Sequence, residues 1–290
     1  MSGNLIDLRR RIVSVKNTQK ITKAMKTVSA VKLRKSVMKI NSSLPILNKI
    51  EYLIKQVSKS IDLNISSLMQ KRENGEIVIV AISADKGLCG SFNSNLAKEA
   101  EQYYMKVLKE GGNPSFVTIG KKVNHYIVKK NLRIRRNFPD VMIGLNSKNA
   151  KEITDYLRSI FLGEEIKEIR FIFTRYISAS QQEISDKLLF PVKLDHKETD
   201  DEVDIEYIFE PEPKEILEIL IPRYVDSIVF HTLLESSASE HVARMIAMEL
   251  ATQNASEMIE KLTLTLNKMR QASITNELLE IITATEALSN

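Results

Sequence analysis

The sequence predicts an α/β fold: a Rossmann-like central domain plus an antiparallel coiled coil of long N- and C-terminal helices. All nine Phe and eight Tyr lie between Tyr52 and Phe230, so both ends of the chain lack aromatic residues. Residues 223–288 contain neither Gly nor Pro, and a helix of that length needs a partner helix to cover it. Short β-branched runs alternate with amphipathic stretches in the middle, which is typical of an α/β layer domain.

Composition excludes several classes of protein. The 290 residues are 43% hydrophobic and 27% charged, as in an ordinary folded protein. No apolar run approaches the roughly 20 residues of a membrane-spanning helix. Cys89 is the single cysteine, which excludes an internal disulfide and suits a reducing compartment. We therefore expect a protein of the bacterial cytoplasm that reaches a membrane only through a complex.

The N-terminal segment, residues 1–70, is expected to form the first coiled-coil helix. Apolar residues recur there at intervals of three and four, beginning with Leu5, Leu8, Ile12 and Val15. Thr18, Gln19 and Thr22 interrupt this seam, and Ile21 resumes it one position over. Pro45 is expected to kink or restart the helix, and the charged turn at 71–75 to end it.

An α/β globular domain is expected over residues 76–192. The β-branched run at 77–82 predicts a strand covered on both faces. Further predicted strands and helices alternate along the chain, which favours a mostly parallel sheet. The predicted strands are 114–119, 132–136 and 168–176, the predicted helices are 94–110, 121–130 and 147–161, and 181–190 is expected to be an antiparallel edge strand.

An acidic connection is expected over residues 193–222. Residues 195–218 hold eleven acidic side chains against Lys197 and Lys214. The second coiled-coil helix is then expected over residues 223–290, beyond Pro222. Its residues 267–275 are mostly Asn, Gln, Ser, Thr and Ala, a surface suited to many weak and replaceable contacts.

No motif specifies an active site, and we expect no catalytic, cofactor-binding or metal-binding residue. The turn at 85–91 lies between a predicted strand and helix, where phosphate loops occur, but it lacks both glycine-rich nucleotide signatures. Two glycines three apart fit a tight structural turn equally well. The four histidines lack ligand spacing, and the acidic segment lacks a calcium-loop pattern.

The N-terminal arm is strongly basic. Residues 1–40 hold eleven Lys and Arg against Asp7, a balance of 11 − 1 = +10 within a chain of net charge +5. Such an arm is compatible with nucleic acid, although no aromatic side chain is placed to stack on bases. Two alternative functions stay open from the residues: a dinucleotide-dependent enzyme with dimerisation arms, and a nucleic-acid-binding protein with a basic arm.

Five motifs, in order along the chain, resemble the γ subunit of bacterial F-type (F1Fo) ATP synthase. They are residues 10–25, 85–90, 207–211, 238–245 and 267–275. One departure is Ala284-Thr285, where that family has Gly-Ala. Because alanine favours helix over glycine by about 1 kcal/mol, this departure bears on a local contact at the helix end.

The resemblance implies a central-stalk rotor at the cytoplasmic face of the bacterial membrane, with no catalytic site of its own. Its coiled coil would enter the α3β3 ring and couple ion-driven c-ring rotation to ATP synthesis and hydrolysis there. By analogy Met25, Arg270, Gln271 and Thr275 would contact the β subunits. Lys16, Lys20, Lys23 and Lys26 would meet acidic β loops. Tyr207 and Glu210 would belong to the foot that meets the ε subunit and the c-ring.

Overall fold

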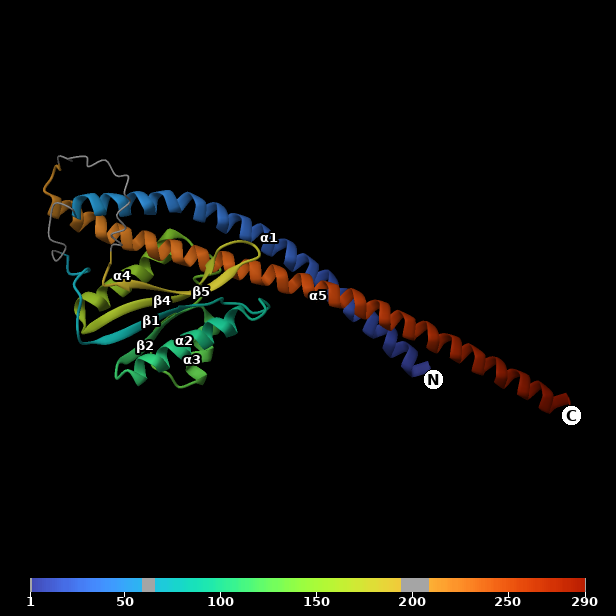
Figure 1. Ribbon diagram of the computed structural model, residues 1–290. Helices are drawn as coiled ribbons and strands as arrows, with labels where there is room; N and C mark the ends of the chain where they lie inside the picture. Colours follow the sequence, from blue (N-terminus) through green and yellow to red (C-terminus); the bar gives the residue numbers. More distant parts are fainter. Residues whose placement is uncertain (1, 59–65, 194–208, 290) are drawn as a thin grey trace. The chain divides into compact units, whose positions relative to one another are not determined.

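The computed structural model describes residues 2–58, 66–193 and 209–289 (Figure 1). It divides into two compact units, one formed by residues 30–243 and one by residues 1–29 together with 244–290. The long helices α1 (Ser2–Ser58) and α5 (Pro213–Ser289) contribute to both units. None of the described helices is long and apolar enough to span a membrane.

The larger unit is built on a five-stranded sheet of order β3-β2-β1-β4-β5. Strands β1 (Glu76–Ile82), β2 (Asn113–Ile119), β3 (Ile134–Phe138) and β4 (Ile166–Tyr176) pair in parallel. Strand β5 (Gln182–Phe190) pairs antiparallel with β4 at the edge, which confirms the predicted mostly parallel sheet with one antiparallel edge.

Helices cover both faces of this sheet (Figure 1). On one face, α2 (Phe92–Lys109) and α3 (Lys121–Lys129) pack on Ile79, Ala81 and Phe116. On the other face, α4 (Ser147–Gly163) and parts of α1 and α5 pack on alternate residues of β1, among them Val78 and Val80. Covering on both faces explains why β1 reads as a continuous apolar run.

The smaller unit is an antiparallel pair of helix segments joined by polar contacts. Gln19 of α1 donates from Nε2 to Oγ of Ser256 at 2.7 Å, and the hydroxyls of Thr22 and Thr252 lie 2.7 Å apart. These side chains are the ones that interrupt the apolar seam of the sequence, and they face the partner helix. The antiparallel coiled coil predicted from the two ends of the chain is confirmed.

The helix ends differ from the predicted boundaries. Helix α1 passes through Pro45 without a break and ends at Ser58, and the described part of 59–70 contains no helix. Helix α5 begins at Pro213 and includes Pro222, so the acidic connection does not extend to residue 222. Proline in a helix interior costs about 3 kcal/mol. The burial of Leu217, Ile221 and their neighbours in the core compensates for it.

The remaining predicted elements differ from the structure by a few residues at their ends, the usual scatter of helix and strand boundaries. Strand β3 is displaced at both ends, spanning Ile134–Phe138 rather than residues 132–136. Asn131 explains it, since its φ of 54° places a turn directly before the strand.

Candidate functional site

Asp85 organises the loops at the carboxyl edge of the sheet. Its carboxylate is buried and accepts three backbone hydrogen bonds, from the N–H groups of Lys121 (3.1 Å), Asp140 (2.9 Å) and Met142 (3.2 Å). The start of a helix such as α3 is where an anion binds in nucleotide-binding α/β domains. Here one of those N–H groups, that of Lys121, is held by the chain's own carboxylate.

Neighbouring side chains satisfy further backbone groups in the same way. Ser83 accepts from the N–H of Val123 at 2.9 Å, and Asn93 accepts from the N–H of Ala84 at 3.0 Å. Gly120, with φ of 93°, precedes α3, and a Cβ there would lie 2.2 Å from the carbonyl oxygen of Ser83. These contacts support the structural interpretation of the turn at 85–91.

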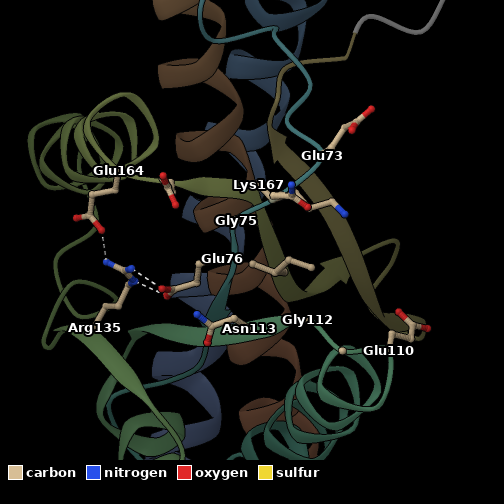
Figure 2. A pocket seen from close by; sticks show the side chains of 13 residues that line it. Glu73, Gly75, Glu76, Glu110, Gly112, Asn113, Arg135, Glu164 and Lys167 are labelled. Atoms are coloured by element: carbon tan, nitrogen blue, oxygen red, sulfur yellow. Dashed lines mark hydrogen bonds and ion pairs between the residues drawn. The ribbon is translucent and has the colours of Figure 1, made fainter.

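The opposite, amino edge of the sheet carries a cavity of about 580 Å³ (Figure 2). A bidentate pair lies in its wall: Arg135 of β3 donates to both carboxylate oxygens of Glu76 of β1, at 2.5 and 2.6 Å. Ser115 of the intervening strand β2 also donates to Glu76. Other lining residues are Glu73, Glu110, Glu164, Glu165 and Lys167.

The surroundings of this ion pair favour the charged form of both groups. Burial opposes ionisation of Glu76, but hydrogen bonds from Arg135 and Ser115 and the charges of Arg135 and Arg133 outweigh it and hold the pKa of Glu76 below its usual value. Hydrogen bonding to Glu76 raises the pKa of Arg135. The described residues contain no group of three His, Cys, Asp or Glu placed to hold a metal ion. Through Glu76 of β1, Ser115 of β2 and Arg135 of β3, these hydrogen bonds tie three strands together.

The four residues expected to contact β subunits all lie in the smaller unit. Arg270, Gln271 and Thr275 share an exposed part of α5, and Thr275 donates its hydroxyl to the carbonyl of Gln271 at 3.0 Å. Met25 of α1 is half-buried. Because Thr22 lies opposite Thr252, Met25 lies about 20 residues, or about 30 Å, from Arg270 along the coil. The structure therefore does not bring Met25 together with the other three.

The basic arm and the expected foot are placed only in part. Lys16, Lys20 and Lys23 are exposed, whereas Lys26 forms an ion pair with Glu249 of α5. Glu210 is exposed just before α5 begins. Tyr207 lies outside the described residues.

Helix α5 continues beyond its partner helix. Gln19 contacts Ser256, and α1 begins 17 residues before Gln19, so α1 starts opposite about residue 273 of α5. The last stretch of α5 then has no α1 beside it (Figure 1). Large apolar side chains are about half-exposed there: Ile274, Leu278, Leu279, Ile281 and Ile282.

Sequence reasoning missed Asp85, Glu76 and Arg135 as organising residues. The sequence does contain a signal for Glu76 and Arg135. An acidic residue begins the first strand, and three arginines lie between residues 133 and 136, which is the charge pattern of an ion pair between strands. Nothing in the sequence shows that Asp85 reaches the loops after two other strands.

Taken together, these features define a class: an α/β domain that includes parts of two long helices, whose remaining parts form an antiparallel pair in which one helix continues beyond the other. A family model described as ATP synthase matches residues 4–288. The chain is 40% identical over 286 residues to the ATP synthase gamma chain of Geotalea uraniireducens and 41% identical to that of Geotalea daltonii, covering 99% of each chain in both cases. The protein belongs to the ATP synthase gamma chain family.

Solved structures show the same fold. A chain of the Euglena gracilis mitochondrial ATP synthase, in a structure of OSCP, F1 and c-ring, matches with a TM-score of 0.70 at 20% identity, covering 99% of this chain and 95% of that one. The family result leaves no support for the alternatives of a dinucleotide-dependent enzyme or a nucleic-acid-binding protein.

Proposed function

We propose that this chain is the central-stalk rotor of an F1Fo ATP synthase, coupling ion-driven c-ring rotation to ATP synthesis and hydrolysis in the α3β3 ring. The unaccompanied end of α5 carries this proposal. A helix end with five half-exposed Ile and Leu side chains between residues 274 and 282 presents an apolar surface of the kind that a partner covers. A cavity in a partner assembly, such as the centre of a ring, covers such a helix on all sides.

The shaft surface, defined as Arg270, Gln271 and Thr275, is proposed to contact the β subunits. Its side chains are exposed and polar, so each contact is weak and can be exchanged as the helix turns. Met25 would contact the ring at a different level, about 30 Å along the coil. Lys16, Lys20 and Lys23 are available to acidic loops of β, whereas Lys26 is already paired with Glu249.

Coupling follows from asymmetry. A shaft changes the conformational equilibrium of each β subunit only when its contacts with the three subunits differ in free energy. One helix pair with a lone extended end presents a different surface in each direction. Rotation of that surface would present each β subunit with the same sequence of contacts in turn.

The larger unit is proposed to lie towards the membrane. Glu210, exposed at the start of α5, and Tyr207 are proposed to form a foot that meets the ε subunit and the c-ring. The complex would then hold the chain at the cytoplasmic face of the bacterial inner membrane. We propose that the chain has no catalytic site of its own, which the use of Asp85 as a structural carboxylate supports.

Co-purification tests this proposal. A tagged copy of the full chain, recovered from native membranes after mild detergent extraction, should bring α and β with it in excess over itself, together with ε and c. A control tag on an unrelated soluble protein should recover none of them. Recovery of the chain without α and β, or with a bound dinucleotide or nucleic acid, would refute the proposal.

A further inference from the structure

A buried histidine of α5 lies where four elements of the larger unit meet. His231 is 8% exposed and faces Ser43 of α1, at 3.1 Å from Nδ1 to Oγ. Its other ring nitrogen, Nε2, lies 3.9 Å from Oε1 of Glu235, one helical turn along α5. Arg175 of β4 and Lys187 of β5 act on both groups electrostatically.

The hydrogen bonds of Ser43 indicate which ring nitrogen of His231 carries the proton. The hydroxyl of Ser43 donates to the carbonyl oxygen of Ile40 at 3.0 Å. We assign the proton to Nδ1 of His231, because a hydroxyl that donates to Ile40 has only its lone pairs left for the histidine. In the neutral imidazole Nε2 is then unprotonated, at 3.9 Å from Oε1 of Glu235.

Glu235 has two competing partners at the same oxygen. Oε1 lies 3.9 Å from Nε2 of His231 and also 3.9 Å from Nε of Arg175. Burial lowers the pKa of His231, and the charges of Lys187 and Arg175 lower it further. Burial raises the pKa of Glu235, against the opposing effect of the same two cations. With His231 neutral, the carboxylate is attracted chiefly to Arg175.

We propose that His231 is a proton-operated switch in the contact between α5 and the β4–β5 edge of the sheet. A proton taken from solvent at Nε2 gives this nitrogen an N–H and a positive charge directed at Glu235. Glu235 then pairs with His231 within α5, since residues four apart lie on one helix face. Arg175 loses its carboxylate partner, and the tie between β4 and α5 weakens.

The direction of the pH effect follows from the lowered pKa of His231. A histidine with a depressed pKa in the folded state binds its proton only below its ordinary value of 6.5, so the switch operates below about pH 6.5. Above that pH the Arg175–Glu235 contact is intact.

Nitrogen NMR of the full chain with labelled histidine tests the proposed protonation of His231 and its dependence on Glu235 and Arg175. The wild-type spectrum at pH 7.5 should show His231 neutral with the proton on Nδ1. Because Glu235 favours the charged ring, E235Q should lower the His231 pKa further, by about one unit. R175Q should raise it by a similar amount. The exposed His125 serves as an internal reference. A proton on Nε2 in the neutral form, or an unchanged pKa in both variants, would overturn the proposal.

Hydrogen exchange tests the proposed weakening of the contact between β4 and α5 when His231 is protonated. Protection factors of β4 and β5 amides should fall when the pH drops below the His231 transition, and E235Q should show the lower protection at both pH values. H231N keeps a donor for Ser43 but cannot be protonated, so its protection should not change across the transition; H125Q should behave as wild type. An equal loss of protection in H231N and in wild type would refute the switch.

Discussion

Arg135 and Glu76 form a two-pronged ion pair across the sheet, with Nε at 2.5 Å from Oε1 and Nη2 at 2.6 Å from Oε2 (Figure 2). A third nitrogen of Arg135, Nη1, lies 2.8 Å from Oε2 of Glu164, just after α4. One guanidinium therefore joins β3 to β1, past the intervening β2, and to the end of a helix. Because Glu76 is only 6% exposed, it cannot exchange Arg135 for water.

Replacing Arg135 with methionine should lower the free energy of unfolding by about 3 kcal/mol, because the buried carboxylate of Glu76 loses its bidentate partner and keeps only Ser115 and the half-exposed Arg133, whose guanidinium lies 3.3 Å away. Urea denaturation of the full chain, followed by circular dichroism, measures the change. The double variant E76L/R135M should recover most of the loss, since no buried charge remains. A double variant as unstable as R135M alone would contradict this explanation.

The Glu76–Arg135 pair also predicts how the stability of the folded chain depends on pH. The pKa of Glu76 is lowered in the folded state, so its ion pair contributes stability above the unfolded value of about 4.5 and loses it as the pH falls through the folded pKa. Wild-type stability should therefore fall below pH 4.5 more steeply than that of E76Q. Urea midpoints between pH 3.5 and 7 measure the difference, and parallel curves for the two proteins would argue against it.

Asp85 should be required for the carboxyl-edge loops. In D85A the N–H groups of Lys121, Asp140 and Met142 lose a charged acceptor, which should cost about 3 kcal/mol or more. D85N should lie between D85A and wild type. Its remaining oxygen still serves Lys121 and Asp140, which share Oδ1, but its amide opposes Met142. Urea unfolding ranks the three proteins, and equal stability of D85N and D85A would show that the shared oxygen matters little.

Charge reversal at Arg270 tests the proposed shaft surface. R270E should leave the complex assembled but reduce ATP-driven proton pumping several-fold in inverted membrane vesicles, because an exposed contact with β becomes repulsive. K148E is a matched control, since it reverses the charge of an exposed residue of α4 in the α/β domain, away from the proposed shaft surface. Unchanged pumping in R270E would reject a role for this residue in coupling.

The absence of aromatic residues from both helical ends leads to a further prediction. A bulky side chain on the lone end of α5 would dock firmly at one angle and slow rotation. L278W should assemble yet turn over ATP more slowly, with the effect visible as longer pauses in single-molecule rotation. V128W introduces the same ring at a position of equal exposure, 55%, in the α/β domain, and should turn freely. Free rotation of L278W would reject the hypothesis.

Sequence patterns predicted the elements well where burial is periodic. The apolar run of β1 and the helical spacing around Leu8 and Ile12 report directly which faces are covered. Sequence patterns gave the wrong helix boundaries at Pro45 and Pro222. Local propensity favours a helix end at each proline, whereas tertiary packing keeps the helix intact. The candidate contact residues of α5 came from family resemblance, because an exposed polar helix face has no distinguishing pattern of its own.

The sequence alone determined the fold class, the two helical ends and membership of a family, since each depends on patterns that are local or recur along the chain. Tertiary structure decided the partners of single polar groups. Asp85 meets amides 36 to 57 residues away, and Glu76 meets Arg135 59 residues away. The physical reason is that a charged or polar side chain is satisfied by whichever group the fold places within about 3 Å, and sequence distance does not encode that.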